Sequence, residues 1–402
     1  MKKLFFKQLL GISFATTFIA TTSFADSTPQ PTQSAVPQII LSAPSVNAKA
    51  YVIMDADTGT IIAQKNANKR LPPASLTKMM TLYLATGALQ NGQINLDDKV
   101  RISKKAWSQS GSRMFIKEGS LVPVEDLLQG IIVASGNDSC VALAEYIAGN
   151  ENTFTKMMNE TADALGMKDS HFIDSTGLPN KAHYTTAHDL SLLAQALVNH
   201  YPDYYNKGWY KEKWFTWNKI KQNNRNRLLW RDPSVDGIKT GHTNEAGFCL
   251  VSSAKRNGMR LISVLLDAPT DMARATESEA LLNYGFRFYT TQKLFSANQT
   301  IATPRVWLGT QNNIKLGLNQ DLYVTVPKGQ YAHLKASMDL ISTSLQAPIT
   351  QGQVYGKVKV TLNGETIETA PLVALESDAQ GSFLSRLSDH MMMFFGNIRH
   401  QA

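Results

Sequence analysis

A serine and a lysine three residues apart, at the start of a long apolar segment, constrain this chain more than any other feature. The segment is PPASLTKMMTLYLATGALQ, residues 72–90, in which Ser75 and Lys78 follow two prolines. Pro72 and Pro73 can precede a helix but cannot sit inside one, so the pattern predicts a helix that begins at about Ser75. Residues three apart share a helix face, which places the Lys78 amine beside the Ser75 hydroxyl.

This pairing predicts an activated nucleophile. The positive end of the helix dipole stabilises the oxyanion that forms when a serine attacks. The segment has almost no polar side, so we expect a buried helix in which desolvation pushes Lys78 toward the neutral form that a base needs. The alternative is that Ser75 only caps the helix and Lys78 is a surface residue. The spacing alone does not decide, because Ser252 and Lys255 repeat it.

Two more short motifs follow Ser75 in the chain. Ser135 and Asn137 flank a glycine that interrupts an apolar helical segment, and Lys239, Thr240 and Gly241 stand just before a segment with strand-like alternation. A loop at 135–137 would expose a hydroxyl and an amide to a cleft, although the same residues would also serve as plain helix caps. An extended strand at 239–241 would pair with a peptide, while its lysine and threonine attract a carboxylate.

The N-terminus predicts export. Residues 1–25 combine three lysines, an apolar stretch too short to span a membrane and small residues before Ala25, which is typical of a secretory signal peptide. Its removal lowers the net charge from +8 to +5, because three lysines and no acidic residue are lost. Such a mild excess suits an anionic membrane surface or an acidic polymer, but it lacks the dense basic patch expected of a nucleic-acid-binding protein. Residues 26–45, rich in Ser, Thr, Pro and Gln, predict a flexible lead-in.

The chain has only two cysteines, Cys140 and Cys249, so it has no disulfide framework. Each lies inside an apolar segment, which favours two buried free thiols, while a single bridge between them stays open as the alternative. The eight histidines show no spacing typical of zinc ligands. We therefore predict neither a metal nor another cofactor. The oligomeric state does not follow from the sequence.

Hydrophobic periodicity predicts a mixed α/β fold. A chain of 402 residues with 43% hydrophobic composition can bury a large core and still form a second domain. We expect one α/β domain at 46–288, in which an antiparallel sheet carries a cluster of helices inserted between its strands, and a small all-β domain at 289–380. The expected hairpin strands are 50–54 and 60–64, and the later strands are 247–254 and 260–267. Asn257-Gly258 predicts the turn between the later strands, and Asn363-Gly364 predicts a hairpin in the second domain. The expected helices are 123–134, with Pro123 in its first turn, 138–148, 153–165, 187–200, with Thr186 as its cap, and 271–285.

The C-terminal segment 381–402 predicts an amphipathic helix. At 100° per residue its apolar side chains fall within one arc and its polar side chains occupy the rest. The segment is too polar to span a bilayer, so we expect it to lie on the outer face of the inner membrane, unless it docks on the protein's own second domain. The apolar positions are Phe383, Leu384, Leu387, Met391, Phe394, Phe395 and Ile398.

The motifs together closely resemble a known family. The segments AYVIMDADTGTIIAQKNANKRLPPASLTKMMT, SGNDSCVALAE, NRNRLLW, VDGIKTGHTNEAGFCLVSSA and LLNYGFRFY are similar to those of the D-alanyl-D-alanine carboxypeptidases among the low-molecular-mass penicillin-binding proteins. The three motifs also follow the order seen in class A β-lactamases, with glycine in place of aspartate in the middle motif. The resemblance implies a transpeptidase-like fold, acylation by β-lactams, and removal of the terminal D-alanine from peptidoglycan stem pentapeptides. It also points to a periplasmic enzyme anchored by its C-terminal helix.

The same resemblance implies roles for single residues. Ser75 would be the acylated nucleophile, Lys78 its base and Ser135 a proton relay to the departing amine. Asn137 would contact the substrate amide. The carboxylate and oxyanion region would contain Lys239, Thr240, Gly241, His242, Arg274 and, more weakly, Arg225. Without a substrate carboxylate, we expect the cations of Lys239 and Arg274 to lack a neutralising group. The loop after Trp107 looks shorter than in some relatives. The resemblance therefore does not predict substrate access or the rate of deacylation near this loop.

Other functions compete with this interpretation. A serine β-lactamase would share the acylation step, but no segment like Glu-x-Glu-Leu-Asn supplies a class A deacylating glutamate, so we expect slow β-lactam hydrolysis. A catalytically inactive wall-binding protein is expected to have lost a motif residue, and none is missing. A DD-endopeptidase that cleaves cross-links is the remaining alternative. A carboxypeptidase should require a substrate that ends in a free carboxylate, whereas an endopeptidase should not. This requirement distinguishes the two functions.

Overall fold

The computed structural model describes residues 42–342 and 344–400, with side chains only up to residue 393 in the last helix. The predicted signal peptide, 1–25, and residues 26–41 of the predicted lead-in lie outside this range. The predicted apolar side chains of Phe394, Phe395 and Ile398 also lie outside it.

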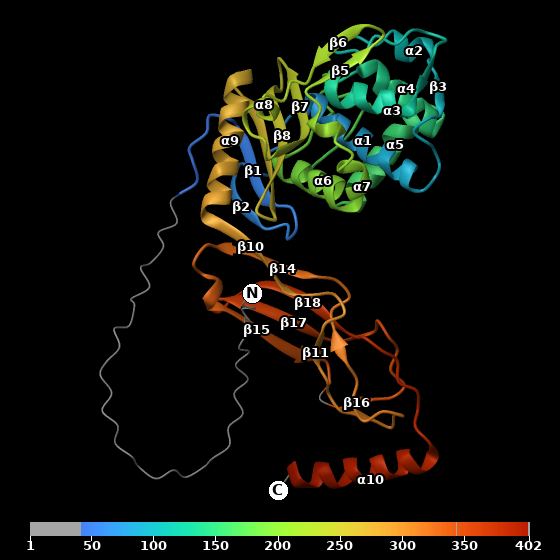
Figure 1. Cartoon of the computed structure of the whole chain (residues 1–402), viewed down its shortest axis with the longest axis vertical. Helices are drawn as coiled ribbons and strands as arrows, with labels where there is room; N and C mark the ends of the chain where they lie inside the picture. Colours follow the sequence, from blue (N-terminus) through green and yellow to red (C-terminus); the bar gives the residue numbers. More distant parts are fainter. Residues whose placement is uncertain (1–41, 343, 401–402) are drawn as a thin grey trace, which may run out of the picture. The chain divides into compact units, whose positions relative to one another are not determined.

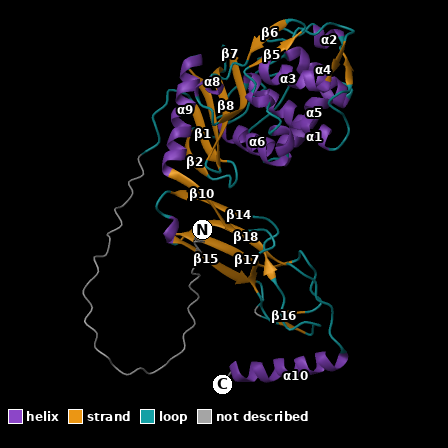
Figure 2. Cartoon of the chain, viewed as in Figure 1, coloured by secondary structure: helices purple, strands orange, loops and turns teal. Residues whose placement is uncertain are grey.

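A five-stranded antiparallel sheet in the order β2-β1-β9-β8-β7 organises the first part of the chain (Figures 1 and 2). The N-terminal hairpin therefore joins strands that follow it by some two hundred residues, as the sequence predicted, and the helices between them form a separate cluster. The strands are β1 (Ala50–Asp55), β2 (Ile61–Lys65), β7 (Val235–Thr243), β8 (Gly247–Arg256) and β9 (Met259–Ala268).

Both faces of this sheet are covered, because successive side chains of a strand point to opposite faces. In β1, Ile53 packs in the cluster that includes residues of α9 (Asp271–Phe288), whereas Val52 and Met54 belong to the core shared with the helical cluster. Helix α6 (Ala187–His200) packs on β1 and β9. All six residues of β1 are buried, as expected for a central strand with two covered faces.

The helical cluster follows the predicted pattern with two corrections. Thr186 caps α6 by accepting a 3.0 Å hydrogen bond from the Asp189 amide, as predicted.

Pro123 ends strand β4 and precedes α3 instead of lying in its first turn. The α-helix after the two prolines begins at Lys78, because residues 74–77 form a 3₁₀ turn. The elements are η1 (Ala74–Thr77), α1 (Lys78–Gln90), β3 (Lys99–Arg101), α2 (Lys104–Trp107), β4 (Leu121–Pro123), α3 (Val124–Gln129), the π-helical turn η2 (Gly130–Ala134), α4 (Asn137–Ala148), α5 (Glu151–Ala164), α7 (Pro202–Tyr205), η3 (Trp209–Lys211), β5 (Trp214–Trp217), β6 (Ile220–Asn223) and α8 (Leu228–Arg231).

Two Asn-Gly pairs form the hairpin turns that the sequence predicted. Asn257 and Gly258 have φ of 50° and 87°, and Asn363 and Gly364 have φ of 52° and 92°. Positive φ at both central residues is the geometry of a type I′ turn, which asparagine and glycine adopt at the lowest cost. The first turn joins β8 to β9 and the second joins β17 (Val354–Leu362) to β18 (Glu365–Ala374).

Residues 289–380 form β-structure with a core of their own. The larger sheet has the order β11-β13-β18-β17-β15, and its buried residues include Leu316, Val358 and Leu372. This agrees with the predicted small all-β domain. The other described strands are β10 (Tyr289–Phe295), β11 (Thr300–Ala302), β12 (Val306–Trp307), β13 (Leu316–Gly317), β14 (Leu322–Pro327), β15 (Leu334–Leu340) and β16 (Leu345–Gln346), and Tyr331–His333 form the 3₁₀ turn η4.

A last helix, α10 (Phe383–His400), follows this β-structure as predicted. The described side chains of its predicted apolar arc, Phe383, Leu384, Leu387 and Met391, are exposed, from 48% at Leu387 to 75% at Leu384. On its polar side, Asp389 accepts a 2.7 Å hydrogen bond from the Leu308 amide. Among the described residues, no helix combines the length and the apolar character that a membrane crossing requires.

Candidate active site

Ser75 lies in a 3₁₀ turn instead of in the first turn of an α-helix. The predicted contact with Lys78 forms nevertheless, with 3.0 Å between Ser75 Oγ and Lys78 Nζ. A 3₁₀ turn has three residues per turn, so the side chains at i and i+3 lie directly above one another. The turn starts from a left-handed residue, Ala74, with φ of 47°. Such conformations are costly for residues other than glycine and cluster at functional sites.

Lys78 is fully buried, so the alternative of a surface lysine is wrong. Its Nζ lies 2.7 Å from Asn137 Oδ1 and 2.6 Å from the carbonyl oxygen of Thr176. Burial is the largest cause that lowers the pKa of Lys78, and the nearby carboxylates of Asp174 and Asp138 oppose it. Lys78 therefore loses its proton at a lower pH than an ordinary lysine does, as the sequence predicted.

Ser135 is the left-handed residue, with φ of 58°, that separates η2 from α4. Its hydroxyl accepts a 3.0 Å hydrogen bond from Lys239 Nζ, which ties the second motif to the third. Lys239 is 2% exposed, and its pKa lies well below the ordinary lysine value because of burial first and the positive charges of Lys78 and Arg225 next. The site therefore contains two hydroxyl–amine pairs, Ser75 with Lys78 and Ser135 with Lys239. Sequence reasoning had assigned Ser135 as a proton relay but Lys239 only to the carboxylate and oxyanion region.

Asn137 connects Lys78 to the loop after Trp107. Its Oδ1 accepts from Lys78, and its Nδ2 donates a 2.7 Å hydrogen bond to the carbonyl of Ser110. The neighbouring Asp138 accepts 2.8 Å hydrogen bonds from the amides at 114 and 115, so the loop is held at two points. This loop therefore forms one wall of the site.

A cleft of about 740 Å³ opens over these groups. Strand β7 is the edge strand of the sheet. Within residues 42–342 and 344–400, its outer row of backbone groups has no ladder partner, as the predicted peptide pairing requires. His242, at the end of the motif strand, stacks on Phe248 with 4.0 Å between ring centroids. Of the predicted site residues, the cleft is lined by Ser75, Ser135, Arg225, Thr240, Gly241, His242 and Arg274, while Lys78, Asn137 and Lys239 lie buried beneath it.

Arg225 and Arg274, the arginines that the family resemblance assigned to the carboxylate and oxyanion region, both line the cleft. Arg225 Nη1 donates to Ser112 Oγ over 3.0 Å, and Arg274 Nη1 donates to the Gly241 carbonyl over 3.1 Å. Arg274 Nη2 also lies 2.5 Å from Asp271 Oδ1, so the expectation that no group neutralises Arg274 in the free protein is wrong. Asp271, at the start of α9, is one turn away from Arg274, and this i, i+3 spacing was the signal that could have revealed the pair.

The rival serine–lysine spacing at 252 and 255 is not a site. Both residues lie in strand β8, where side chains three apart point to opposite faces. Ser252 is accordingly buried and Lys255 is exposed. The cysteines do not take part in the site chemistry described above. Cys140 and Cys249 are buried and free, as favoured from the sequence, and burial raises the pKa of each thiol to about 12.

Comparison with known families agrees with this arrangement. The family described as D-alanyl-D-alanine carboxypeptidase matches residues 38–270, which is more than half of the chain, and the C-terminal domain of penicillin-binding protein 5 matches residues 289–380. The chain belongs to the D-alanyl-D-alanine carboxypeptidase family. The family resemblance predicted from the motifs is thereby confirmed, as are the mixed α/β fold class and the prediction of a serine hydrolase.

Individual members of this carboxypeptidase family match over most of their length. D-alanyl-D-alanine carboxypeptidase DacC of Escherichia coli is 44% identical over 91% of this chain and 92% of its own. The crystal structure of penicillin-binding protein 5 from Haemophilus influenzae superposes with a TM-score of 0.80 at 42% identity, covering 85% of this chain and all of the other. Penicillin-binding protein D2 from Listeria monocytogenes, solved in an ampicillin-bound form, has a TM-score of 0.56 at 31% identity, covering 61% of this chain and 100% of that one.

Proposed function

We propose that this carboxypeptidase removes the terminal D-alanine of peptidoglycan stem pentapeptides through an acyl-enzyme on Ser75, and that β-lactams acylate the same atom. The observation that carries the proposal is the 3.0 Å contact between Ser75 Oγ and the amine of Lys78, a lysine that is buried and whose pKa is lowered. Ser75 Oγ forms the bond to the carbonyl carbon, and its proton passes to Lys78 Nζ.

The second hydroxyl–amine pair completes the reaction. Ser135 gives its proton to the departing D-alanine nitrogen and recovers one from Lys239 Nζ, which is 3.0 Å away. A water then attacks the ester and returns a proton to Lys239 through Ser135, while the proton held on Lys78 returns to Ser75 Oγ. All protons are restored at the end of the cycle, and the lowered pKa values of both lysines bring these transfers to a lower pH than ordinary lysines would allow.

Carboxylate recognition separates this function from endopeptidase action. Arg274 is buried at the end of the cleft, and a substrate carboxylate would compete with Asp271 for its guanidinium. We expect a peptide that ends in D-Ala-D-Ala to be hydrolysed with a kcat/KM at least about 10-fold higher than its C-terminal amide. Similar values for the two peptides would contradict this recognition and favour the endopeptidase alternative.

Arg274→Ala should lower kcat/KM for the free-acid peptide by about 5- to 150-fold, the equivalent of about 1–3 kcal/mol for a lost charge-assisted hydrogen bond. Arg227→Ala is the matched control, because Arg227 lines the same cleft and also pairs with Asp271 but is about half exposed. Solvent screening should keep the effect of the control within about 3-fold. Equal losses in the two variants would show that no specific carboxylate contact is made at Arg274. The Arg274→Ala variant should lose little activity toward the amide, which checks the assignment independently.

We also propose that α10 binds the periplasmic surface of the inner membrane. Support comes from the two sides of the helix. Asp389 on the polar side contacts Leu308 and Arg305, whereas Phe383, Leu384 and Met391 are exposed by more than half. If α10 docked on the protein's own core, its apolar face would be buried and its polar face exposed. Instead, the apolar face is exposed and the polar face makes the contacts. The predicted signal peptide would deliver the enzyme to that compartment.

Vesicle sedimentation tests this proposal. Leu387→Asp with Met391→Asp should reduce binding of the full chain to vesicles of phosphatidylethanolamine and phosphatidylglycerol by about 10-fold or more, because two charges would have to enter the interface. Ser388→Asp adds a charge on the polar side of the same helix and should have a small effect. Deletion of residues 381–402 should leave soluble, active enzyme. Unchanged sedimentation of the truncated enzyme, or loss of its folding, would show that α10 packs inward.

A further inference from the structure

The orientation of the Lys78 amine depends on two oxygen atoms that can only accept hydrogen bonds. These are Asn137 Oδ1 at 2.7 Å and the Thr176 carbonyl at 2.6 Å. A neutral amine has two N–H groups and one lone pair. When both N–H groups donate to these two acceptors, the lone pair of Nζ remains free. It can then accept the hydrogen bond of the Ser75 hydroxyl, whose Oγ lies 3.0 Å away. The Thr176 carbonyl is therefore as important for aiming the base as the motif asparagine is.

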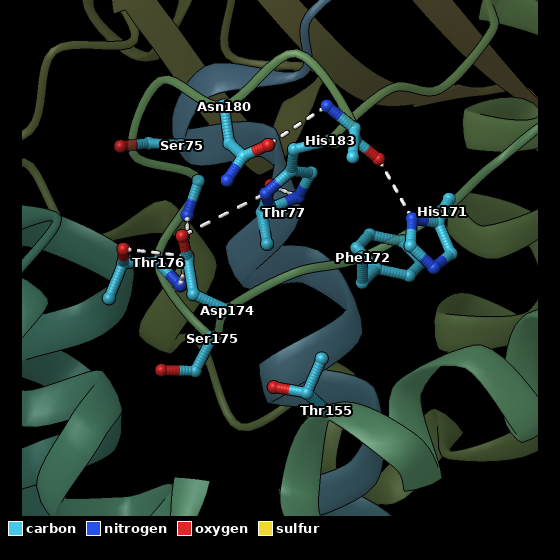
Figure 3. A network of polar contacts seen from close by, with 12 residues as sticks. Ser75, Thr77, Thr155, His171, Phe172, Asp174, Ser175, Thr176, Asn180 and His183 are labelled. Atoms are coloured by element: carbon cyan, nitrogen blue, oxygen red, sulfur yellow. Dashed lines mark hydrogen bonds and ion pairs between the residues drawn. The ribbon is translucent and has the colours of Figure 1, made fainter. Parts of the chain in front are cut away.

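A carboxylate holds the loop that presents this carbonyl. Asp174 Oδ1 accepts hydrogen bonds from the Thr176 amide at 2.7 Å, the Thr176 hydroxyl at 2.8 Å and the Gly177 amide at 2.7 Å (Figure 3). Gly177 has φ of +87°, and a Cβ at this position would lie 1.8 Å from the Ala74 carbonyl oxygen. The loop thus packs directly against the turn that carries Ser75, and only glycine permits that approach.

His183 connects the same carboxylate to the nucleophile turn. Its Nε2 lies 3.0 Å from Thr77 Oγ1, and its Nδ1 lies 3.9 Å from Asp174 Oδ2, as the dashed contacts in Figure 3 show. The ring is 2% exposed and meets the Phe172 ring edge-on, with 5.8 Å between centroids. Within the described part of the chain, Nδ1 has no hydrogen-bond partner. Asp174 is the carboxylate that faces Nδ1. Thr77, the partner of Nε2, immediately precedes Lys78 in the chain.

Burial fixes the charge state of this histidine. Desolvation lowers the pKa of His183 to about 4, with Asp174 opposing and His171 and Lys78 reinforcing the shift. The ring is therefore neutral at neutral pH. A proton on Nδ1 would face the Asp174 carboxylate, which leaves Nε2 to accept from the Thr77 hydroxyl.

We propose that Asp174 and His183 are positioning residues, which hold the Thr176 carbonyl on Lys78 Nζ and thereby direct the lone pair of that amine at Ser75. The inference rests on the proposed function, because it assumes that Lys78 is the base. Neither Asp174 nor His183 is among the residues that line the cleft. Both therefore act on the acylation step through Lys78 and not through substrate binding. A displacement of about 1 Å in a group that aims a catalytic base can cost about 100-fold in rate.

The test separates acylation from binding. Stopped-flow kinetics with a chromogenic cephalosporin give K′, the dissociation constant of the non-covalent complex, and k2, the rate constant of acylation within it. We expect Asp174→Ala, which removes all three loop contacts, to lower k2 by about 10- to 100-fold with K′ changed less than about 3-fold. Asp174→Asn keeps an Oδ1 atom that can accept the hydrogen bonds of the loop. Its k2 should therefore be close to that of the wild type. His183→Ala should lower k2 by about 10-fold, and its effect should not add to that of Asp174→Ala.

A matched control comes from another aspartate of the same domain. Asp98 also accepts hydrogen bonds from a backbone amide, that of Asn95, and from a hydroxyl, that of Tyr146, but it is not in contact with Lys78. Asp98→Ala should leave k2 and K′ unchanged. If Asp174→Ala does not fold, His183→Ala carries the test.

Two results would overturn the inference. The first is an unchanged k2 in folded His183→Ala or in folded Asp174→Ala. The second is a loss that falls on K′ as much as on k2, because it would indicate general damage to the cleft. Neither result affects the proposed function, which fails instead if Ser75→Ala still forms the covalent adduct or if Lys78→Met retains normal k2.

Discussion

Replacement of Ser75 by alanine is expected to abolish covalent labelling by penicillin and to lower kcat for D-Ala-D-Ala peptide hydrolysis by roughly 10⁴- to 10⁶-fold. The hydroxyl is the atom that attacks, and the groups around it act as one unit whose function is lost with any member. The remaining cleft would still bind the peptide, because Arg274, Thr240 and the free edge of β7 are unchanged. The loss should therefore appear in kcat far more than in KM.

Peptide mass spectrometry of the labelled enzyme checks this expectation. The wild-type adduct should map to the peptide that contains Ser75, and Ser75→Ala should carry none. Ser252→Ala is the matched control, since Ser252 has the same spacing to a lysine but is buried in β8 with its lysine on the other face. An adduct at another residue of wild type, or an adduct that persists in Ser75→Ala, would refute the assignment.

Replacement of Lys78 by methionine is expected to lower the acylation rate by about 10³-fold or more at neutral pH. Methionine has a similar length and leaves the helix packed, but it has no lone pair for the Ser75 proton, so the general-base contribution is lost. Two carbonyl oxygens, those of Asn137 and Thr176, would lose their donor. Lys78→Gln supplies an amide donor toward them and should be equally inactive, which separates loss of the base from loss of folding.

The pH profile of acylation gives a second measurement of the same role. The reactive form of Lys78 is neutral, so the acylation rate should rise with pH through the pKa of Lys78. It should fall again where Lys239, which must be protonated to resupply Ser135, loses its proton. Because burial lowers that pKa, the rise should occur at a lower pH than the titration of an ordinary lysine. In Lys78→Met the residual rate should not show this rise. A wild-type profile that still rises through the ordinary lysine range would show that Lys78 is not the desolvated base.

Much of the site was predictable because its determinants are local. A serine and a lysine three apart after two prolines meet in either an α-helical or a 3₁₀ turn, which is why the Ser75–Lys78 contact survived an incorrect helix start. Asn-Gly pairs predicted both hairpins from their own backbone preferences. The continuous apolar character of residues 79–90 predicted a buried helix and, through it, the lowered pKa of Lys78.

Contacts between distant residues were not predictable in the same way. The pairing of Lys239 with Ser135 spans 104 residues, and that of Lys78 with the Thr176 carbonyl spans 98. The contact of Lys78 with Thr176 uses a backbone carbonyl. Every residue has such a carbonyl, so the residue type at position 176 cannot predict the contact. Asp174 and His183 likewise showed no motif, because their relation arises only when the loop after α5 packs on the nucleophile turn.

The sequence by itself therefore determined the elements, the order of the three motifs and the residue types that the chemistry needs, since hydrophobic period, turn preference and i, i+3 spacing all act over a few residues. The tertiary structure alone decided which polar groups meet in the dry interior. There, the depth of burial and the neighbouring charges shift the pKa values of Lys78 and Lys239. Burial is a property of the whole fold, because it depends on residues that chain order keeps far apart.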